Sequence, residues 1–175
     1  LPETFTTGFT MQAEGNDEPV DGATTAWLCE LAGAHDVAIC GSLIIRENDR
    51  YFNRLVWAQP DGSVYTYDKR HLFHMGGEDK PFTRGERRLI IEFRDWRICP
   101  LICYDLRFPG WSRGRNDYDL LLYVANWPAT RKSAWETLIP ARAVENLCYA
   151  AGVNRTGVDG TGKAYGRERS QLLRH

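Results

Sequence analysis

The segment RICPLICYDLRFPGW, residues 97–111, changes abruptly from apolar sequence to polar, turn-forming sequence. The apolar run ends at Cys103, and Pro109 and Gly110 follow shortly after it. This pattern predicts a buried strand that leads into a helix. A cysteine at such a junction can serve as a nucleophile, because backbone N–H groups at a helix start favour a thiolate and can hold an oxyanion. The alternative is a small core cysteine, since free cysteine is among the most buried residue types.

Outward from this segment, the sequence alternates between predicted strands and helices. Apolar and β-branched runs predict strands at residues 36–46, 51–58, 63–68, 88–93, 96–103, 118–126 and 148–154. Apolar residues at helical spacing predict helices at residues 23–34, 107–116 and 132–147. Turn residues at 59–62 and at 94–95 predict two hairpins. This order of elements is typical of an α/β fold in which helices cover buried strands.

Composition excludes several functional classes. The 175 residues carry a net charge of −1, with 43% hydrophobic and 26% charged residues, which is ordinary for one globular domain. A chain so nearly neutral has no global field that would attract nucleic acid or a membrane surface. No apolar run is long enough to span a bilayer. The five cysteines are an odd number without disulfide spacing, which favours the reducing cytoplasm.

Several blocks together resemble one known family. They read LPETFTTGF at residues 1–9, YDKRHLFHMGGE at 67–78, CYDLRFPGWSR at 103–113, YVANWP at 123–128 and ARAVENLCYAAGVNRTG at 141–157. In this order they are similar to the carbon–nitrogen hydrolase (nitrilase) superfamily, and most similar to its omega-amidase-like branch. The resemblance implies a four-layer α-β-β-α sandwich of the nitrilase type. It also implies a homodimer or larger homo-oligomer, assembled through the face near residues 103–111.

The resemblance further implies a Glu–Lys–Cys triad. By motif, these residues are Glu3, Lys69 and Cys103, and Glu78 is a second, supporting glutamate. Cys103 would attack the amide and form a thioester, Glu3 would transfer protons, and Lys69 would hold the oxyanion with a backbone N–H near Tyr104. These groups supply every proton and charge that the reaction needs, so no cofactor is expected.

The substrate implied by the resemblance is a small linear amide. Omega-amidase-like relatives hydrolyse the terminal amide of 2-oxo acids such as 2-oxoglutaramate and 2-oxosuccinamate. Arg107 is a candidate partner for the substrate carboxylate, although a structural salt bridge to Asp105 or to a helix acid is an equal alternative. Trp127 and Phe73 are candidate pocket walls, and Asn126 is a candidate polar contact. The residues Arg142, Glu145 and Asn146 are expected to tie the long helix to the site.

Residues 1–175 are interpreted as a single, partial domain that lacks both edges. Only two residues precede Glu3, and the final GKAYGRERSQLLRH, residues 162–175, departs from the family's glycine- and serine-rich sequence. Two alternatives to the omega-amidase function therefore stay open. One is another nitrilase branch, which would act on a carbamoyl amide or on deaminated glutathione. The other is an inactive fragment that serves only in oligomerisation or binding.

Three further patterns have plainer interpretations. His71 and His74 with Cys99 and Cys103 match no standard zinc spacing, so we expect no metal site and predict that Cys99 is a core residue. The glycines from Gly157 to Gly162 predict a turn and not a phosphate loop. Eight arginines between residues 84 and 115 are interleaved with acids, which favours a solvated, paired surface.

Overall fold

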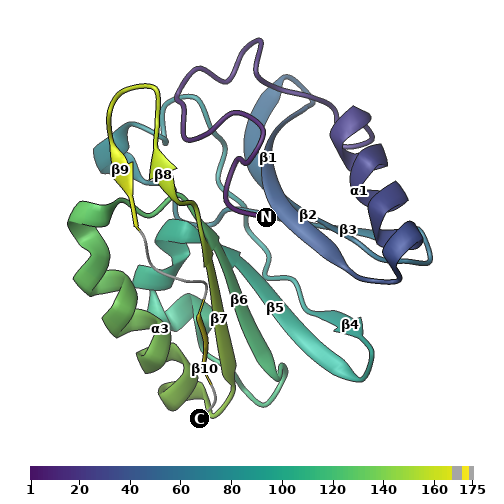
Figure 1. Cartoon of the computed structure of the whole chain (residues 1–175), viewed down its shortest axis with the longest axis vertical. Helices are drawn as coiled ribbons and strands as arrows, with labels where there is room; N and C mark the ends of the chain where they lie inside the picture. Colours follow the sequence, from purple (N-terminus) through teal and green to yellow (C-terminus); the bar gives the residue numbers. More distant parts are fainter. Residues whose placement is uncertain (167–170, 174–175) are drawn as a thin grey trace. The chain divides into compact units, whose positions relative to one another are not determined.

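The structure is a computed structural model that describes residues 1–166 and 171–173. The chain divides into two compact units, one of residues 3–87 with Leu1 and one of residues 88–175 with Pro2. Each unit has its own sheet and its own helices (Figure 1). The expected departure from the family at residues 162–175 lies partly outside the described residues.

The first unit is built on a three-stranded antiparallel sheet with the order β1-β2-β3. Its elements are α1 (Ala23–His35), β1 (Ile39–Glu47), β2 (Arg50–Ala58), β3 (Val64–Asp68) and the 3-10 helix η1 (His74–Gly76). Helix α1 covers one face of the sheet, where Leu28 and Ala32 join the side chains of Leu43, Val56 and Ala58 in one buried cluster. The predicted helix at residues 23–34 is therefore confirmed.

Tight turns set the register of this sheet. The predicted turn at residues 59–62 is confirmed, because Gln59 N donates to Ser63 O over 2.9 Å and Gly62 adopts a φ of 85°. The turn between β1 and β2 uses Asn48 and Asp49 with φ values of 49° and 57°, which suits the right-handed twist of a hairpin.

The opposite face of the same sheet carries polar residues. Side chains alternate along a strand, so Leu43 and Val56 face α1 while Ser42 and Asn53 face away from it. Lys69 follows β3 and continues the ladder, since its backbone N–H donates to Asn53 O over 3.0 Å. The strand register therefore places the side chains of Ser42, Asn53 and Lys69 on the face of the sheet opposite to α1.

The second unit contains a five-stranded sheet with the order β10-β7-β6-β5-β4. Its strands are β4 (Ile91–Phe93), β5 (Trp96–Ile102), β6 (Leu120–Ala125), β7 (Tyr149–Asn154) and β10 (Gln171–Leu173). The central strands β5, β6 and β7 are parallel, and the outer pairs are antiparallel. The confirmed hairpin turn at Arg94 and Asp95 has positive φ at both residues.

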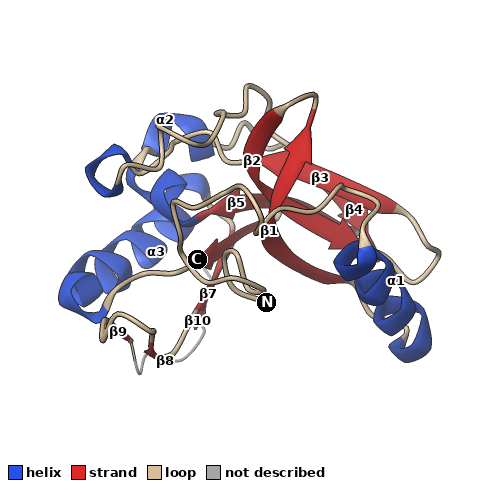
Figure 2. Cartoon of the chain, turned by 90° about the horizontal axis from the view of Figure 1, so that it is seen from above, coloured by secondary structure: helices blue, strands red, loops and turns tan. Residues whose placement is uncertain are grey.

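Helix α3 (Lys132–Asn146) packs beside β7 and β10 (Figures 1 and 2). Trp135 and Ile139 are fully buried on its inner side. Gly152 in β7 permits this approach, because a Cβ at that position would lie 2.5 Å from the Trp135 ring. The predicted helix at residues 132–147 is confirmed.

The predicted helix at residues 107–116 is wrong. A 3-10 helix, η2 (Cys103–Arg107), follows β5, and helix α2 spans only Pro109–Ser112. Proline has no N–H and disfavours helical φ/ψ at the preceding residue, and Phe108 accordingly adopts φ −117° and ψ 85°. The strand expected at residues 96–103 ends at Ile102, because η2 begins at Cys103. The strand expected at residues 88–93 is limited to β4.

Short elements complete the second unit. The 3-10 helix η3 (Ala129–Arg131) precedes α3, and β8 (Gly157–Val158) pairs with β9 (Ala164–Tyr165) across the predicted turn. Among the arginines of residues 84–115, Arg88 pairs with Asp117 and Arg97 pairs with Asp119. Within the described residues, no helix has both the length and the apolar character to cross a membrane.

Candidate active site

Three of the predicted site residues meet in the first unit. The Lys69 ammonium donates to Glu3 Oε1 over 2.7 Å and to Glu78 Oε1 and Oε2 over 2.9 and 2.8 Å. These side chains are buried, with exposed fractions of 0% for Glu3, 1% for Lys69 and 0% for Glu78. We call them the carboxylate–lysine cluster. The sequence separates Glu3 from Lys69 by 66 residues, so the fold and not local sequence brings them together.

Two carboxyl groups share one ammonium group in the cluster. Buried charge is strongly unfavourable unless every charged atom is paired or hydrogen-bonded. Two neutral donors add hydrogen bonds to these carboxylates. Asn53 Nδ2 donates to Glu3 Oε1 and to Glu78 Oε1, each over 2.9 Å, and Phe73 N donates to Glu78 Oε2 over 2.6 Å.

Local backbone features hold each member of the cluster. Thr4, next to Glu3, has a φ of 39°, and its N–H donates to Ser42 Oγ over 2.8 Å. Glu78 follows η1 and the left-handed Gly77. Gly85 N donates to Lys69 O over 2.9 Å, and a Cβ on Gly85 would lie 2.1 Å from a backbone oxygen of β3. Only glycine therefore fits beside the backbone that carries Lys69.

Cys103 belongs to the second unit and occupies a strained position. It is half-buried at the first residue after β5, with a φ of 42°. Positive φ is unfavourable for residues other than glycine, and it persists where the surrounding structure enforces it. Such strain clusters at functional sites. Cys103 therefore lies outside β5, the strand that contains Cys99. Cys99 itself is fully buried, as the sequence predicts for a core residue.

The residues on both sides of Cys103 are anchored. On one side, Asp105 Oδ2 accepts a hydrogen bond from Ile102 N over 3.1 Å. On the other side, Arg142 donates to Leu106 O through Nε over 3.1 Å and through Nη2 over 2.7 Å. Both Asp105 and Leu106 are fully buried, and Arg142 is 4% exposed. Arg142 thus connects the long helix α3 to the segment that follows Cys103.

Further predicted residues lie at the same edge of the second sheet. Cys103 follows β5, and Asn126 and Trp127 follow β6, at the carboxyl ends of parallel strands. Trp127 N donates to Asn154 Oδ1 over 2.7 Å, and Asn154 Nδ2 donates back to Trp127 O over 3.0 Å. Ligands of α/β proteins bind outside this edge of the sheet.

The Arg107 guanidinium stacks on the Trp127 ring and does not form a salt bridge to Asp105, the alternative given in the sequence analysis. Its guanidinium carbon lies 5.1 Å from the centre of the Trp127 ring. The Asp105 carboxylate instead accepts the Ile102 N–H, and Arg107 has no carboxylate partner among the described residues. The guanidinium is exposed and free to receive an anion.

The other two predicted binding residues lie among aromatic rings. The Tyr104 ring meets Phe108 edge-on, with centroids 5.2 Å apart. The Phe73 ring lies 6.4 Å from Phe9, in the first unit. Lys69 Nζ lies 5.7 Å from the centre of the same Phe9 ring, so Phe73 borders the carboxylate–lysine cluster.

Burial makes three other thiols poor nucleophiles. It raises the pKa of Cys99 to about 12 and the pKa values of Cys40 and Cys148 to about 11. A thiol attacks as the thiolate, so these residues are largely inert near neutral pH. In the described part of the chain, no group of three or more His, Cys, Asp or Glu side chains is arranged to hold a metal ion.

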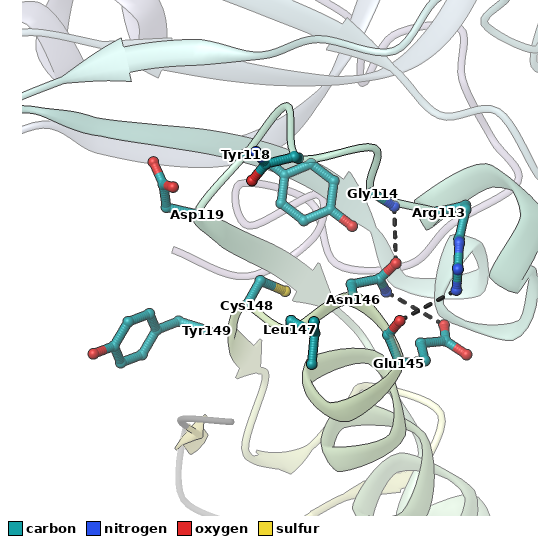
Figure 3. A pocket seen from close by; sticks show the side chains of 10 residues that line it. Arg113, Gly114, Tyr118, Asp119, Glu145, Asn146, Leu147, Cys148 and Tyr149 are labelled. Atoms are coloured by element: carbon teal, nitrogen blue, oxygen red, sulfur yellow. Dashed lines mark hydrogen bonds between the residues drawn. The ribbon is translucent and has the colours of Figure 1, made fainter.

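A separate cavity of about 550 Å³ in the second unit contains none of the predicted site residues (Figure 3). It is lined by residues of the loop before β6 and of the end of α3. Asn146 Oδ1 accepts from Gly114 N over 2.8 Å, and Arg113 Nη1 donates to Glu145 O over 3.2 Å (Figure 3). These hydrogen bonds join the end of α3 to the loop before β6. They account for the polar side chains that line the cavity.

Sequence reasoning missed three polar residues of the site. Ser42, Asn53 and Asn154 each lie within a mainly apolar strand. Ser42 and Asn53 are also buried, and a buried polar side chain is informative because it requires a partner. That signal was available in the sequence, although the partners depend on sheet register.

Known proteins resemble this chain over most of its length. The model of the carbon-nitrogen hydrolase family matches residues 1–167. The chain is 50% identical over 165 residues to the omega-amidase YafV of Yersinia enterocolitica, which covers 94% of this chain and 64% of the relative. It is 35% identical over 162 residues to the 2-oxoglutaramate amidase of Bacillus subtilis, covering 90% of this chain and 62% of the relative. The chain thus spans less than two thirds of the length of these curated relatives.

A solved structure agrees with the fold. XC1258 of Xanthomonas campestris, a CN-hydrolase superfamily protein with an arsenic adduct in its active site, is 48% identical, with a TM-score of 0.96. The match covers 99% of this chain and 68% of that protein. It confirms the predicted fold class, the α/β fold of the nitrilase type. The chain belongs to the carbon-nitrogen hydrolase (nitrilase) family.

Proposed function

We propose that this chain carries the working groups of a thiol amidohydrolase. The observation that carries the proposal is the buried ammonium of Lys69 shared by the carboxylates of Glu3 and Glu78. A cluster of this kind can move a proton and stabilise an anion in a site without water. Cys103, at a strained strand end, is the proposed nucleophile.

The proposed reaction has two halves. In the first, Cys103 Sγ attacks the amide carbon while Glu3 accepts the thiol proton, and Lys69 with a backbone N–H near Tyr104 stabilises the oxyanion. Collapse of this intermediate breaks the C–N bond, and the proton on Glu3 passes to the leaving ammonia. In the second half, Glu3 takes a proton from water and the resulting hydroxide attacks the thioester carbon. The C–S bond then breaks, the carboxylic acid leaves, and the proton on Glu3 returns to Cys103 Sγ. The reaction requires the Cys103 thiol and the Glu3 carboxylate to act on one substrate.

The proposed substrate is the terminal amide of a small 2-oxo acid, such as 2-oxoglutaramate or 2-oxosuccinamate. The names of the Yersinia and Bacillus relatives support this class. The exposed guanidinium of Arg107, held over Trp127, is the proposed partner of the substrate carboxylate. Asn126 would offer a polar contact, and Phe73 an apolar wall.

We also propose how the chain is organised. Residues 1–175 would form one partial carbon–nitrogen hydrolase domain, which the match over residues of both units supports. We propose a homodimer or larger homo-oligomer and a cytoplasmic location. The five free cysteines support a reducing compartment.

The test is ammonia release from 2-oxoglutaramate by the purified protein and by its Cys103→Ala variant. We expect turnover by the parent protein and none by the variant, with little change in thermal stability. A matched control is Cys148→Ala, because burial keeps that thiol protonated. Turnover that survives Cys103→Ala would disprove the thiol mechanism. A folded parent protein that releases ammonia from other amides only would disprove the substrate and leave the mechanism standing.

A further inference from the structure

A buried polar side chain that has no part in the proposed reaction contacts the carboxylate–lysine cluster. Asn53 is 1% exposed, and its amide donates to one oxygen of Glu3 and one oxygen of Glu78. These are the same two oxygens, Oε1 in each case, that accept from Lys69 Nζ. Asn53 therefore bridges the two carboxylates from a second direction.

The direction of this amide is set by a hydroxyl group. Ser42 Oγ donates to Asn53 Oδ1 over 2.8 Å, and it accepts from Thr4 N over 2.8 Å. Because Ser42 uses its only proton on Asn53 Oδ1, the Nδ2 side of the amide must face the carboxylates. The same hydroxyl holds the backbone next to Glu3. One serine thus fixes both the amide and the turn that carries the proposed proton acceptor.

A neutral donor has a chemical advantage at this position. The cluster already holds one ammonium, and a second cation beside Glu3 would stabilise its charged form and weaken it as a proton acceptor. An amide satisfies the buried oxygens without adding charge. An apolar side chain would instead leave two carboxylate oxygens with one donor fewer in a site that excludes water.

We infer that Asn53 is a positioning residue, which holds the Glu3 and Glu78 carboxylates in one fixed arrangement around Lys69, and that Ser42 orients its amide. This inference rests on the proposed function, because it assigns the arrangement a role in that reaction. Asn53 is 1% exposed, and its amide is occupied by the two carboxylates and Ser42. Its loss therefore affects the reaction step and leaves substrate binding intact.

The test compares Asn53→Ala and Ser42→Ala with the parent protein in steady-state hydrolysis of 2-oxoglutaramate. We expect kcat to fall about 10- to 100-fold in Asn53→Ala, because a catalytic group displaced by about 1 Å can cost about 10²-fold in rate, with KM unchanged. Ser42→Ala is expected to lower kcat by a smaller factor. Ser42→Thr keeps a hydroxyl and is expected to restore most of the activity.

A core variant separates positioning from general destabilisation. Val56→Ala removes buried volume from the same strand, on the face that packs against α1. It is expected to lower the melting temperature while kcat per folded molecule stays unchanged. Asn53→Ala with the parent kcat, or a KM effect in place of a kcat effect, would overturn the inference.

A crystal structure of Asn53→Ala distinguishes failure of this inference from failure of the proposed function. If the parent protein releases no ammonia, the proposed function fails, and the structure alone decides the inference. Carboxylates of Glu3 and Glu78 that move apart or away from Lys69 would support it. Carboxylates that stay in place without the amide would overturn it.

Discussion

The carboxylate–lysine cluster and the Cys103 segment are held in place in different ways. The cluster depends on side-chain hydrogen bonds between residues far apart in the chain, such as the 50 residues that separate Glu3 from Asn53. The Cys103 segment depends on its backbone, with a φ of 42° and anchors on Ile102 and Leu106. Buried charges require partners for their charged atoms, whereas the half-buried thiol of Cys103 requires mainly a fixed direction. Substitutions are therefore expected to damage the two regions differently.

The largest combined effect on activity and stability is expected in the cluster, from Lys69→Met. Removing one oxyanion donor typically lowers kcat by about 10²–10³. The same change leaves two buried carboxylates without their cation, and breaking a buried pair costs about 3–5 kcal/mol of stability. Ammonia release and urea unfolding measure the two effects. Lys80→Met is the control, since Lys80 is an exposed lysine of the same loop.

That prediction separates the two regions. Lys69→Met is expected to reduce both activity and stability, while Cys103→Ala reduces activity alone. A Lys69→Met protein that kept the parent stability would mean that the buried carboxylates become protonated without penalty. A variant within tenfold of the parent kcat would remove Lys69 from the reaction.

The next effect distinguishes the two glutamates. Glu3→Ala removes the proposed proton acceptor, and general acid–base groups typically contribute about 10²–10⁴ in rate. Glu78→Ala removes a group that binds Lys69 through both carboxylate oxygens and accepts from Phe73 N. We expect Glu78→Ala to reduce kcat less than Glu3→Ala, measured as ammonia release. The reverse order would mean that the two glutamates exchange roles.

The contrast between local and long-range contacts also explains which features the sequence could predict. The strand ending near Cys103, helices α1 and α3 and two hairpin turns follow from local patterns of apolar and turn residues. Glu3, Lys69 and Glu78 were identified by motif alone, because nothing in a spacing of 66 residues indicates a contact. Asn53 was recognisable only as a polar residue in an apolar strand. Its contact with Ser42 depends on the pairing of β1 with β2, which a single sequence does not specify.

For the short helix after Cys103, the local sequence pattern predicted the wrong bounds. The pattern of residues 107–116 favoured one helix, although Pro109 already marked a break at Phe108. The 3-10 turn that begins at Cys103 is stabilised from a distance, by Arg142 in α3. Local propensity could not reveal that contact, because the two residues lie in different elements.

The smallest predicted effect tests this anchor. Arg142→Met keeps an unbranched apolar stem and removes both hydrogen bonds to Leu106 O. A buried carbonyl left without a donor costs about 1–3 kcal/mol, and we expect kcat to fall about tenfold as the Cys103 segment relaxes. The measurements are kcat for ammonia release and the rate at which iodoacetamide alkylates Cys103.

Arg142 also pairs with Glu145 over 3.0 Å, so the ion pair needs its own control. Glu145→Gln weakens that pair and leaves the bonds to Leu106 O in place. If Glu145→Gln reproduced the loss of kcat, the ion pair within α3 and not the contact with Leu106 would hold the site. If Arg142→Met changed stability alone, the strained geometry of Cys103 would be maintained by Asp105 and the end of β5 without help from α3. In that case the Cys103 segment, unlike the carboxylate–lysine cluster, would be positioned entirely by local structure.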